Sequence, residues 1–409
     1  MKRLKGNAIL GQSGGPTSVI NSSLAGVITA AKNFSGIENV LGMRFGVEGF
    51  IAENIINLGA ESAATIEGLK TTPSGALGSC RYKLKDCDLS RVLEVLKKYD
   101  IRYVFLIGGN DTMDTICRLE KFAAQNKYEL IGIGVPKTVD NDLFGTDHTP
   151  GYPSAARFTA LSVMQAGVLA RDMRKVDQFV IYQSIGREAG WLPAASAAVK
   201  KDSSDAPHIL CLPERAFDKE KFLAEVKKTY DNFSFVSIVC GEGIAYADKT
   251  PVSASQTKDK FSNTEFGAMG GTSAAIALHR MIADEFGFRG EFQITESLPM
   301  CAADRAVKLD IDEAFMAGEA AVELAAAGKT GLMVTLERQK SKEYKCFTGS
   351  VALSDAAAKA KLMPDEFISE NGFYVTDAFL DYVRPLIGEL PEYVKLEAKK
   401  ISLKPGMQK

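Results

Sequence analysis

The chain has 409 residues, of which 46% are hydrophobic and 24% are charged, and its formal net charge is −2. These proportions are typical of a globular protein with a full core, and the length predicts two or three domains or one large bilobed unit. A net charge near zero gives no bulk attraction to nucleic acid or to an acidic membrane. No apolar stretch approaches the roughly 18 residues that a membrane span requires, so neither is an expected partner.

The cysteines and histidines argue against two further classes of site. The seven cysteines are dispersed without a CxxC pair, and the three histidines form no HExxH pattern. A disulfide framework and a structural zinc site are therefore not expected, and a reducing, cytoplasmic location is predicted.

The first predicted unit is a strand, a glycine loop and a helix. An apolar run at residues 8–10 precedes the loop 11–18, and helical periodicity runs from Val19 to Ile28. Glycines such as Gly14 and Gly15 let the backbone approach an anion, and a helix N-terminus offers free N–H groups. The loop is neither GxGxxG nor GxxxxGK[ST], so it is neither a dinucleotide fingerprint nor a Walker loop. A plain strand-to-helix turn remains an alternative.

The next loops contribute an arginine and a carboxylate. Residues 71–81 are mostly small and end in Arg81, which is either solvated or able to close over a phosphate. Residues 102–107 are a predicted strand, followed by a Gly-Gly loop that carries Asp111 and by a helix. A carboxylate at a helix start is commonly a cap. Beside a phosphate-binding loop it can also hold Mg²⁺ together with phosphate oxygens.

The third unit brings a lysine and two aspartates to the end of a predicted buried strand at residues 130–135. Ligands bind at this carboxyl edge in open α/β sheets. Lys137 can hold a transferring phosphate as a point charge, and an aspartate can accept the proton of an attacking hydroxyl. A turn capped by Asp140, Asn141 and Asp142 is the alternative. Three successive strand–loop–helix units favour one shared phosphate site and predict phosphoryl transfer, a reaction that depends mainly on positioning and charge neutralisation.

The second half of the chain predicts another domain. Dense glycine and proline near residues 143–153 mark a boundary. Predicted strands then recur; one ends at a turn carrying Arg187, and another ends in Glu242 between two glycines, a placement that suits a sugar hydroxyl. The expected fold is α/β, with two doubly wound, Rossmann-like domains and the active site in the cleft between them.

Six segments of the chain resemble the phosphofructokinase family. They are Gln12–Thr17, Gly108–Thr112, Pro136–Asp142, Ile185–Arg187, Pro213–Glu214 and Gly241–Gly243. The Pro136–Asp142 loop is highly specific, whereas each Gly-Gly loop alone is weak. The resemblance implies a donor-binding domain of residues 1–145, rejoined by about 295–409, and a sugar-phosphate-binding domain of residues 146–294. It also implies Mg²⁺ as cofactor and a homodimer whose subunits share the substrate site.

The resemblance assigns roles residue by residue. Asp140 would be the general base toward the sugar 1-hydroxyl, and Arg187 would stabilise the transferred charge. The catalytic set would be Asp140, Asp142, Lys137, Asp111 and Arg187. Pyrophosphate would be bound by Gly14, Gly15, Arg81, Asn110, Asp111 and Lys137, of which Asn110 and Asp111 would hold the metal. The sugar phosphate would be bound by Thr138, Val139, Asp140, Ile185, Gly186, Arg187, Glu242, Arg289, Tyr382 and Arg384.

Two residues predict the phosphoryl donor. ATP-using members of the family usually have glycine at the positions of Asp111 and Lys137. The carboxylate of Asp111 would stand where the α-phosphate of ATP goes, and Lys137 would neutralise pyrophosphate without a nucleotide anchor. The pair therefore resembles the pyrophosphate-dependent branch. We expect reversible transfer from pyrophosphate to the 1-hydroxyl of fructose 6-phosphate, a step of glycolysis.

Three departures from the family pattern keep the acceptor open. Asn110 replaces the metal-binding aspartate, Gln178 replaces an arginine from the neighbouring subunit, and Pro299-Met300 replaces a Gln-Arg pair on the 6-phosphate. Lost arginine–phosphate contacts are not neutral. The residues that could compensate are Arg289, Arg305, Tyr382 and Arg384. The alternatives are the same chemistry on another ketose or ketose phosphate, such as sedoheptulose 7-phosphate, and a non-catalytic regulatory or sugar-phosphate-binding subunit.

Overall fold

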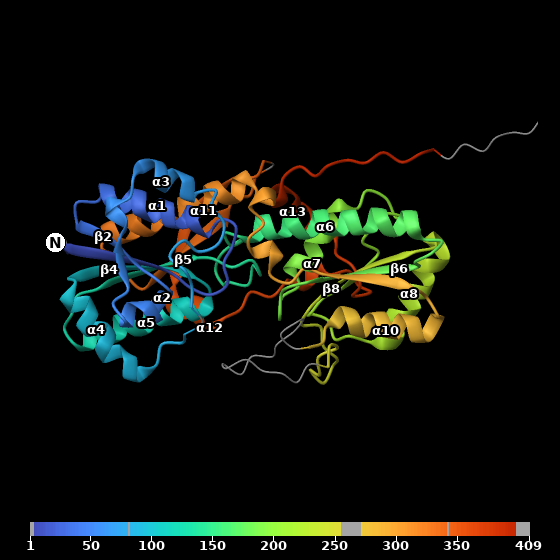
Figure 1. Ribbon diagram of the computed structural model, residues 1–409, viewed down its shortest axis with the longest axis horizontal. Helices are drawn as coiled ribbons and strands as arrows, with labels where there is room; N and C mark the ends of the chain where they lie inside the picture. Colours follow the sequence, from blue (N-terminus) through green and yellow to red (C-terminus); the bar gives the residue numbers. More distant parts are fainter. Residues whose placement is uncertain (1–3, 81, 255–270, 342, 398–409) are drawn as a thin grey trace, which may run out of the picture.

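The computed structural model describes residues 4–80, 82–254, 271–341 and 343–397. Two α/β domains lie side by side along the long axis of the molecule, and each has a largely parallel sheet with helices on both faces (Figure 1). This is the predicted fold class. In the described ranges no helix is long and apolar enough to cross a membrane.

The first domain contains a seven-stranded sheet in the order β11-β10-β5-β4-β1-β2-β3. Its strands are β1 (Gly6–Gln12), β2 (Ile37–Met43), β3 (Ile55–Asn57), β4 (Ile101–Gly108), β5 (Ile131–Pro136), β10 (Leu332–Arg338) and β11 (Cys346–Ala352). The two outer pairs, β2–β3 and β10–β11, are antiparallel, and the inner strands are parallel. Residues 332–352 thus return to the sheet of the first domain.

Two helical layers cover this sheet (Figure 1). One contains α1 (Ile20–Asn33), α3 (Ala63–Leu69) and α11 (Lys308–Ala326), and the other contains α2 (Gly46–Ile51), α4 (Leu89–Lys98), α5 (Asn110–Gln125) and α12 (Leu353–Ala358). Helices α1 and α11 approach closely at Gly26, because a Cβ atom there would lie 2.1 Å from the carbonyl oxygen of Phe315. A residue without a side chain is required at this crossing.

The second domain contains a four-stranded parallel sheet in the order β7-β8-β6-β9. Its strands are β6 (Phe179–Ser184), β7 (Ile209–Cys211), β8 (Val236–Gly241) and β9 (Gly290–Ile294). One face is covered by α6 (Tyr152–Met173) and α7 (Trp191–Ala195), and the other by α8 (Lys219–Phe233) and α10 (Ala274–Phe286).

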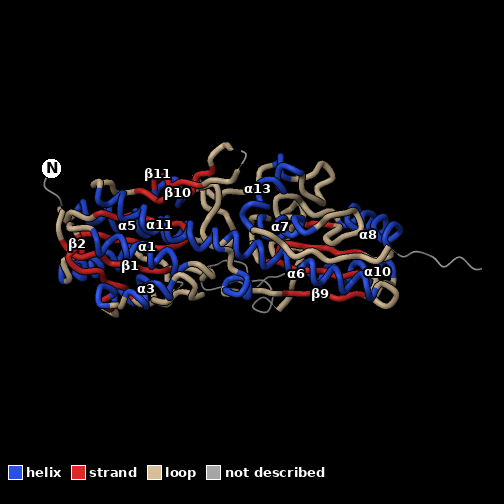
Figure 2. Tube along the Cα trace, turned by 90° about the horizontal axis from the view of Figure 1, so that it is seen from above, coloured by secondary structure: helices blue, strands red, loops and turns tan. Residues whose placement is uncertain are grey.

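The end of the chain departs from the expected domain division. Helix α13 (Asp377–Ile387) lies beside α7 and α6 in both views (Figures 1 and 2). Its residues Phe379, Val383 and Leu386 are buried in the core of the second domain. Their helical spacing creates one apolar face, which α6 and α7 bury. The return to the first domain therefore ends near α12, and the last part of the chain packs on the second domain instead of the first.

Candidate active site

The three loops predicted to bind phosphate begin at one edge of the first sheet. Gln12 pairs with Ile107, and Gly108 pairs with Pro136, so β1, β4 and β5 end side by side. The backbone N–H of Lys137 donates to the carbonyl of Gly108 at 3.1 Å. The carboxyl ends of these strands thus bring the Gly14–Gly15, Asn110–Asp111 and Lys137–Asp142 loops together, as parallel topology predicts.

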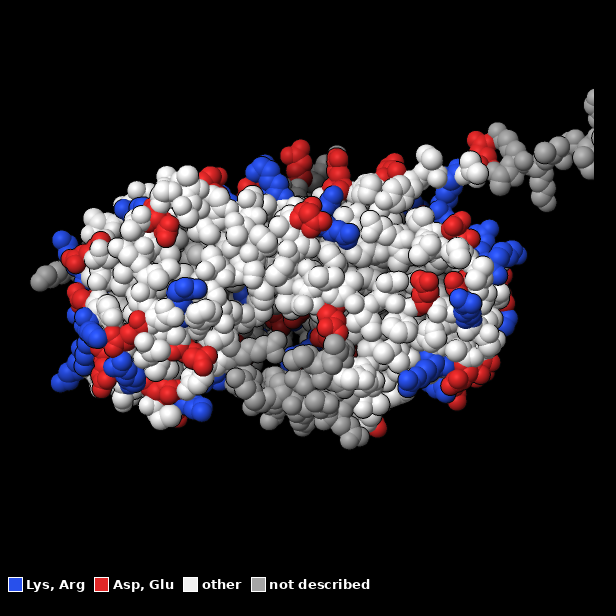
Figure 3. All heavy atoms as spheres, in the orientation of Figure 1, with Lys and Arg blue, Asp and Glu red and all other residues white. Residues whose placement is uncertain are grey.

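The second domain presents its own loops to this edge. Glu242 follows β8, and its backbone N–H donates to the carbonyl of Ser184 at 3.0 Å. The N–H of Gly186 in turn donates to the Glu242 carboxylate at 3.4 Å. A Cβ atom on Gly186 would lie 3.9 Å from the Asp140 carboxylate, so the two domains meet at these residues. Figure 3 shows a hollow between the domains in which acidic side chains are visible.

Lys137 is buried at the donor side of this meeting point. Its side chain reaches the glycine loop, where Nζ donates to the carbonyl of Gly15 at 2.6 Å. A Cβ atom on Gly14 would lie 3.3 Å from Nζ, so the loop packs tightly against the ammonium. Burial lowers the pKa of Lys137 to about 8, against the opposing effect of Asp140 and Asp142. The ammonium therefore remains largely charged at neutral pH and lies where a phosphate on the glycine loop would need a cation.

Asp140 has the properties of a general base. Burial raises its pKa to about 7, the carboxylates of Asp142 and Glu242 add to this rise, and Lys137 and Arg187 oppose it. Burial also raises the pKa of Asp142. In the part of the chain that the structure describes, no hydrogen bond occupies the Asp140 carboxylate, unlike that of a capping side chain. A carboxylate with a pKa near neutrality can accept a proton efficiently at neutral pH.

The residues predicted to hold a metal lie at the start of α5. The Asn110 Oδ1 atom is buried and has no hydrogen-bond partner among the described residues. The Asp111 side chain is 79% exposed and lies 3.5 Å from the Lys83 ammonium. Within the described residues, no group of three or more His, Cys, Asp and Glu side chains could hold an ion. A pair of oxygen ligands fits Mg²⁺, which usually retains waters and takes other ligands from substrate phosphates.

Several predicted acceptor residues lie at the cleft without offering a side chain to it. Val139 and Ile185 are buried in the core of the second domain. The Thr138 hydroxyl accepts from the backbone N–H of Asp140 at 3.1 Å. Arg187 is exposed directly after Gly186. Of these four residues, only Arg187 has a charged side chain that is exposed where the two domains meet. The other three shape the loops on which they lie.

The structure does not bring Arg289 to this site within one chain, which corrects that expectation. Arg289 precedes β9, whose first residue, Gly290, pairs with Phe179 at the start of β6. Its guanidinium pairs with Asp177 at 2.9 Å. Because β6 and β9 are parallel, Arg289 lies at the amino end of the sheet, whereas Ile185 lies at the carboxyl end.

The other compensating residues also have different roles. The Tyr382 hydroxyl accepts from Asn141 Nδ2 at 2.9 Å and donates to the carbonyl of Asp147 at 2.8 Å, so it holds the loop that carries Asp140 and Asp142. Arg384 is exposed, and its position two residues later turns it away from the face of α13 that carries Tyr382. Arg305 donates to Ser162 on α6 at 2.9 Å. The predicted donor residue Arg81 lies outside the described residues.

Lys361 is a residue of the site region that the sequence analysis missed. Its buried ammonium donates to Asn141 Oδ1 at 3.1 Å and to the carbonyls of Thr146 and Asp147 at 3.2 and 2.7 Å. The only signal in the sequence is a lysine followed by two apolar residues, Leu362 and Met363. That signal is weak, because most lysines in such stretches extend their charge to solvent.

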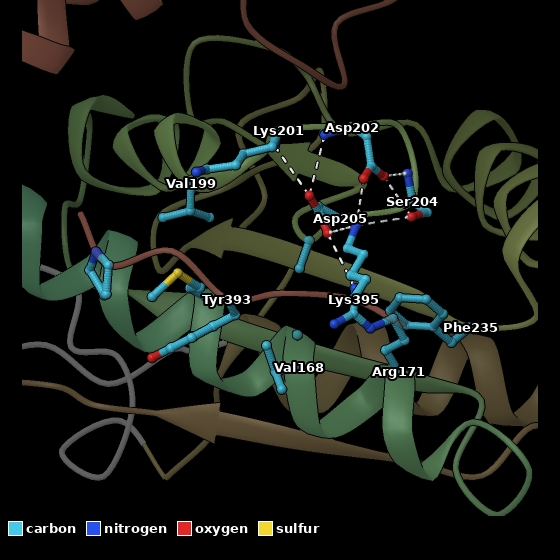
Figure 4. A pocket seen from close by; sticks show the side chains of 14 residues that line it. Val168, Arg171, Val199, Lys201, Asp202, Ser204, Asp205, Phe235, Tyr393 and Lys395 are labelled. Carbon is cyan, nitrogen blue, oxygen red and sulfur yellow. Dashed lines mark hydrogen bonds and ion pairs between the residues drawn. The ribbon is translucent and has the colours of Figure 1, made fainter. Parts of the chain in front are cut away.

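A separate pocket of about 280 Å³ lies on the second domain between α6, the 199–206 loop and the tail (Figure 4). Lys395 pairs with Asp202 and Asp205 at 2.5 and 2.6 Å, and Arg171 pairs with Asp205 at 3.4 Å. Lys201 pairs with Glu392. These charges fasten the tail to its own domain, and none of the predicted site residues lines this pocket.

Comparisons with known proteins show relatives along most of the chain. A family model described as phosphofructokinase matches residues 7–290. The chain is 38% identical to the pyrophosphate–fructose 6-phosphate 1-phosphotransferase of Xanthomonas campestris, over 96% of each protein. It is 31% identical to the sulfofructose kinase of Alkalicoccus urumqiensis, over 89% of this chain and 92% of that protein. The crystal structure of pyrophosphate-dependent phosphofructokinase from Nitrosospira multiformis matches with a TM-score of 0.86 and 36% identity, over 96% of this chain and 95% of that one.

Proposed function

The chain belongs to the phosphofructokinase family, and from this membership and the geometry of the cleft we propose that it catalyses reversible phosphoryl transfer from pyrophosphate to the 1-hydroxyl of fructose 6-phosphate. The products are fructose 1,6-bisphosphate and phosphate, and the reaction is a step of glycolysis. The observation that carries the proposal is that the donor-side loops of the first domain meet the acceptor-side loop of the second; these two groups of loops are the half-sites. Asp140 and the buried Lys137 come from the first domain, and Gly186 faces Asp140 from the second.

Each side chain has one task in the proposed reaction. Asp140 accepts the proton of the 1-hydroxyl as its oxygen attacks the terminal phosphorus of pyrophosphate, and the bond to the bridging oxygen breaks to release phosphate. Asp142 lies beside this base, and its negative charge contributes to the raised pKa of Asp140. Lys137 and Arg187 neutralise charge on the transferring group, and Glu242 accepts hydrogen bonds from sugar hydroxyls. Such positioning and electrostatic terms dominate phosphoryl transfer.

Mg²⁺ is proposed as the cofactor, held by Asn110 Oδ1 and the Asp111 carboxylate. The unpartnered, buried oxygen of Asn110 supports this assignment. Held by these two residues, the ion would neutralise part of the charge of the phosphates. The backbone N–H groups near Gly14 and Gly15 would orient the same phosphates at the start of the first α/β unit.

We also propose that the protein is a cytoplasmic homodimer. All seven cysteines are free thiols, which is consistent with a reducing compartment. β9 lies at an edge of its sheet, and Glu291, Phe292 and Gln293 on it are exposed. An exposed edge of this kind is available for pairing with another chain. Light scattering of the purified protein would test the assembly.

The proposal is tested by supplying the purified protein with Mg²⁺ and crossing two donors with several acceptors. Formation of the 1-phosphorylated product is followed with pyrophosphate or ATP and with fructose 6-phosphate, sedoheptulose 7-phosphate, fructose and a 6-sulfonated ketose. We expect the highest kcat/KM with pyrophosphate and fructose 6-phosphate. If ATP is the better donor, the donor assignment is wrong. If another acceptor is strongly preferred, the acceptor assignment is wrong and the chemistry stands.

A different acceptor is the second candidate, and Met300 favours it. Its sulfur lies 3.5 Å from the position that a Cβ atom on Gly15 would take, so an apolar thioether lies beside this part of the donor loop. Within one chain, none of Arg289, Arg305 and Arg384 takes the place of the family arginine that is absent at Pro299-Met300. A relative named sulfofructose kinase is 31% identical over 89% of this chain. The acceptor panel above distinguishes the two candidates. Ligand binding without turnover would instead support a non-catalytic subunit.

A further inference from the structure

Residues 360–363 form a bridge between the two half-sites. On one side, the backbone N–H of Lys361 donates to the carbonyl of Asp142 at 2.7 Å, and Ala360 forms an antiparallel bridge with Leu143. On the other side, the carbonyl of Lys361 accepts from Trp191 Nε1 at 3.1 Å. The segment thus touches both the loop that carries the proposed base and the helix that follows the acceptor loop.

A buried carboxylate extends this bridge to the acceptor loop. Glu214 accepts from the backbone N–H of Met363 at 3.2 Å and from that of Gly190 at 2.8 Å. Gly190 ends the loop that contains Gly186 and directly precedes Trp191 at the start of α7. Lys361 and Met363 therefore hold the same acceptor-side turn from two directions.

The Lys361 ammonium also holds the loop that carries Asp140. Asn141, between the two aspartates, is fully buried and has a φ of 57°, a left-handed conformation that asparagine tolerates better than most residues. Its Oδ1 atom accepts from Lys361 Nζ at 3.1 Å, and its Nδ2 atom donates to Tyr382. The loop carbonyls of Thr146 and Asp147 accept from the same ammonium. This network holds the loop in one conformation, because both polar atoms of the Asn141 side chain are hydrogen-bonded.

Charged groups surround this ammonium. Asp142 and Asp147 on the loop favour its charge, and Arg338 on β10 opposes it. Burial lowers the pKa of Lys361 to about 7 in spite of the two carboxylates. In return, the ammonium favours the ionised form of Asp142, the neighbour that influences Asp140. Lys361 is thus coupled to the base electrostatically as well as through hydrogen bonds.

We propose that Lys361 is a positioning residue for phosphoryl transfer, which joins the loop bearing Asp140 to the loop bearing Gly186 and keeps base and acceptor at a fixed separation. The expected effect of Lys361 on kcat rests on the proposed function. The physical coupling between the two loops does not. Misplacement of reacting groups by about 1 Å can cost on the order of 10²-fold in rate. The loss should appear in kcat, because the residue touches neither substrate.

The first test compares Lys361→Met with Lys359→Met. Lys359 is in the same segment, but it is half exposed and pairs with Asp355. We expect Lys361→Met to lower kcat by about 10- to 100-fold with little change in KM. The acid limb of the kcat profile should move to lower pH, because Asp142 loses a cation that favours its ionised form and then raises the pKa of Asp140 less. Lys359→Met should match the wild type. Equal kcat and equal pH profiles in the two variants would refute the positioning role.

Trp191 supplies a second readout that does not require turnover. It is the only tryptophan of the chain, and the Lys361 ammonium lies 4.9 Å from its ring centroid. We expect pyrophosphate bound at the donor loops to change Trp191 fluorescence in the wild type and in Lys359→Met. The response should be weaker in Lys361→Met, which keeps the backbone bonds to Asp142 and Trp191 but loses the ammonium. A full wild-type response in Lys361→Met would overturn the role of the ammonium in the coupling. If the wild type responds but transfers no phosphoryl group, the proposed function fails and the bridge remains.

Trp191→Phe keeps the proposal testable should Lys361→Met fail to fold. This variant removes the Nε1 donor to the Lys361 carbonyl and replaces a buried ring that packs on Phe367 and Tyr382 with a smaller one. We expect a smaller fall in kcat than for Lys361→Met, again without a matching rise in KM. Because both residues belong to one bridge, their combined effect should be smaller than the product of the single effects. An unchanged kcat in Trp191→Phe, or independent effects in the double variant, would argue against a shared bridge.

Discussion

Replacing Lys137 with methionine should lower activity while raising stability. The lysine ammonium is buried with 3% of the residue exposed, and it donates to the carbonyl of Gly15 at 2.6 Å. No carboxylate forms an ion pair with it among the described residues, and Asp140 and Asp142 act on it only through space. Methionine has a similar length and no charge to desolvate. The substitution therefore removes a proposed catalytic cation. It also removes the free-energy cost of burying that charge when the protein folds.

The two expected magnitudes follow from the structure. Removing one preorganised donor to a developing negative charge typically costs about 2.7–4 kcal/mol, or on the order of 10²–10³ in kcat. In the folded protein, a pKa lowered to about 8 means that the charged form of Lys137 is disfavoured, a cost on the order of 3 kcal/mol. Methionine avoids this cost at pH 7, so the free energy of unfolding should rise by up to that amount.

Steady-state kinetics and denaturant unfolding test the two effects on the same preparation. Wild-type stability should rise as the pH increases from about 8 towards the value near 10.4 of an unfolded lysine, because only the unfolded state still binds the proton there. The variant should lack this rise. A kcat within threefold of the wild type would refute the catalytic role. A loss of stability at pH 7 would refute the argument that the buried charge is uncompensated.

Four more outcomes are expected. Asp140→Asn should lower kcat by about 10²–10⁴-fold with little change in KM, since it removes general-base catalysis; a wild-type rate would exclude Asp140 as the base. Asp111→Gly should raise kcat/KM for ATP relative to pyrophosphate, and an unchanged ratio would contradict the proposed block to the nucleotide. Asn110→Ala should raise the Mg²⁺ concentration for half-maximal rate, measured by titration after chelation; equal titrations would remove Asn110 from the metal site. The wild-type profile of kcat/KM for pyrophosphate should rise near pH 7 as Asp140 loses its proton and fall near pH 8 as Lys137 does; a flat profile would contradict both assignments.

The strands and loops that build the site could be predicted because their signals are local. The run before Lys137 is apolar throughout, as expected of a parallel strand covered on both faces, and it forms β5 (Ile131–Pro136). Glycines mark the ends of β1 and β4 in the same way. Parallel topology then places the carboxyl ends at one edge, so the donor half of the site follows from strand order alone.

The positions of Arg289, Tyr382 and Lys361 could not be predicted because they depend on long-range packing. Arg289 lies at the amino end of β9, a fact set by its register with β6. Tyr382 reaches the catalytic loop because α13 packs on the second domain and not on the first. Lys361 is coupled to Asn141 across 220 positions of sequence. No periodicity or spacing within a short window contains this information.

The opposite pKa shifts of Lys137 and Asp140 bear on the direction of the reaction. Both side chains are buried, and burial disfavours charge on each, so the base titrates near pH 7 and the ammonium near pH 8. A group with a pKa near the working pH serves as a base in one direction and as an acid in the other. Protonated Asp140 could therefore return the proton to the sugar oxygen when phosphate attacks the bisphosphate. A strongly acidic aspartate at the same place would be a weaker base and would rarely be protonated at neutral pH, so burial of this loop favours proton transfer in both directions.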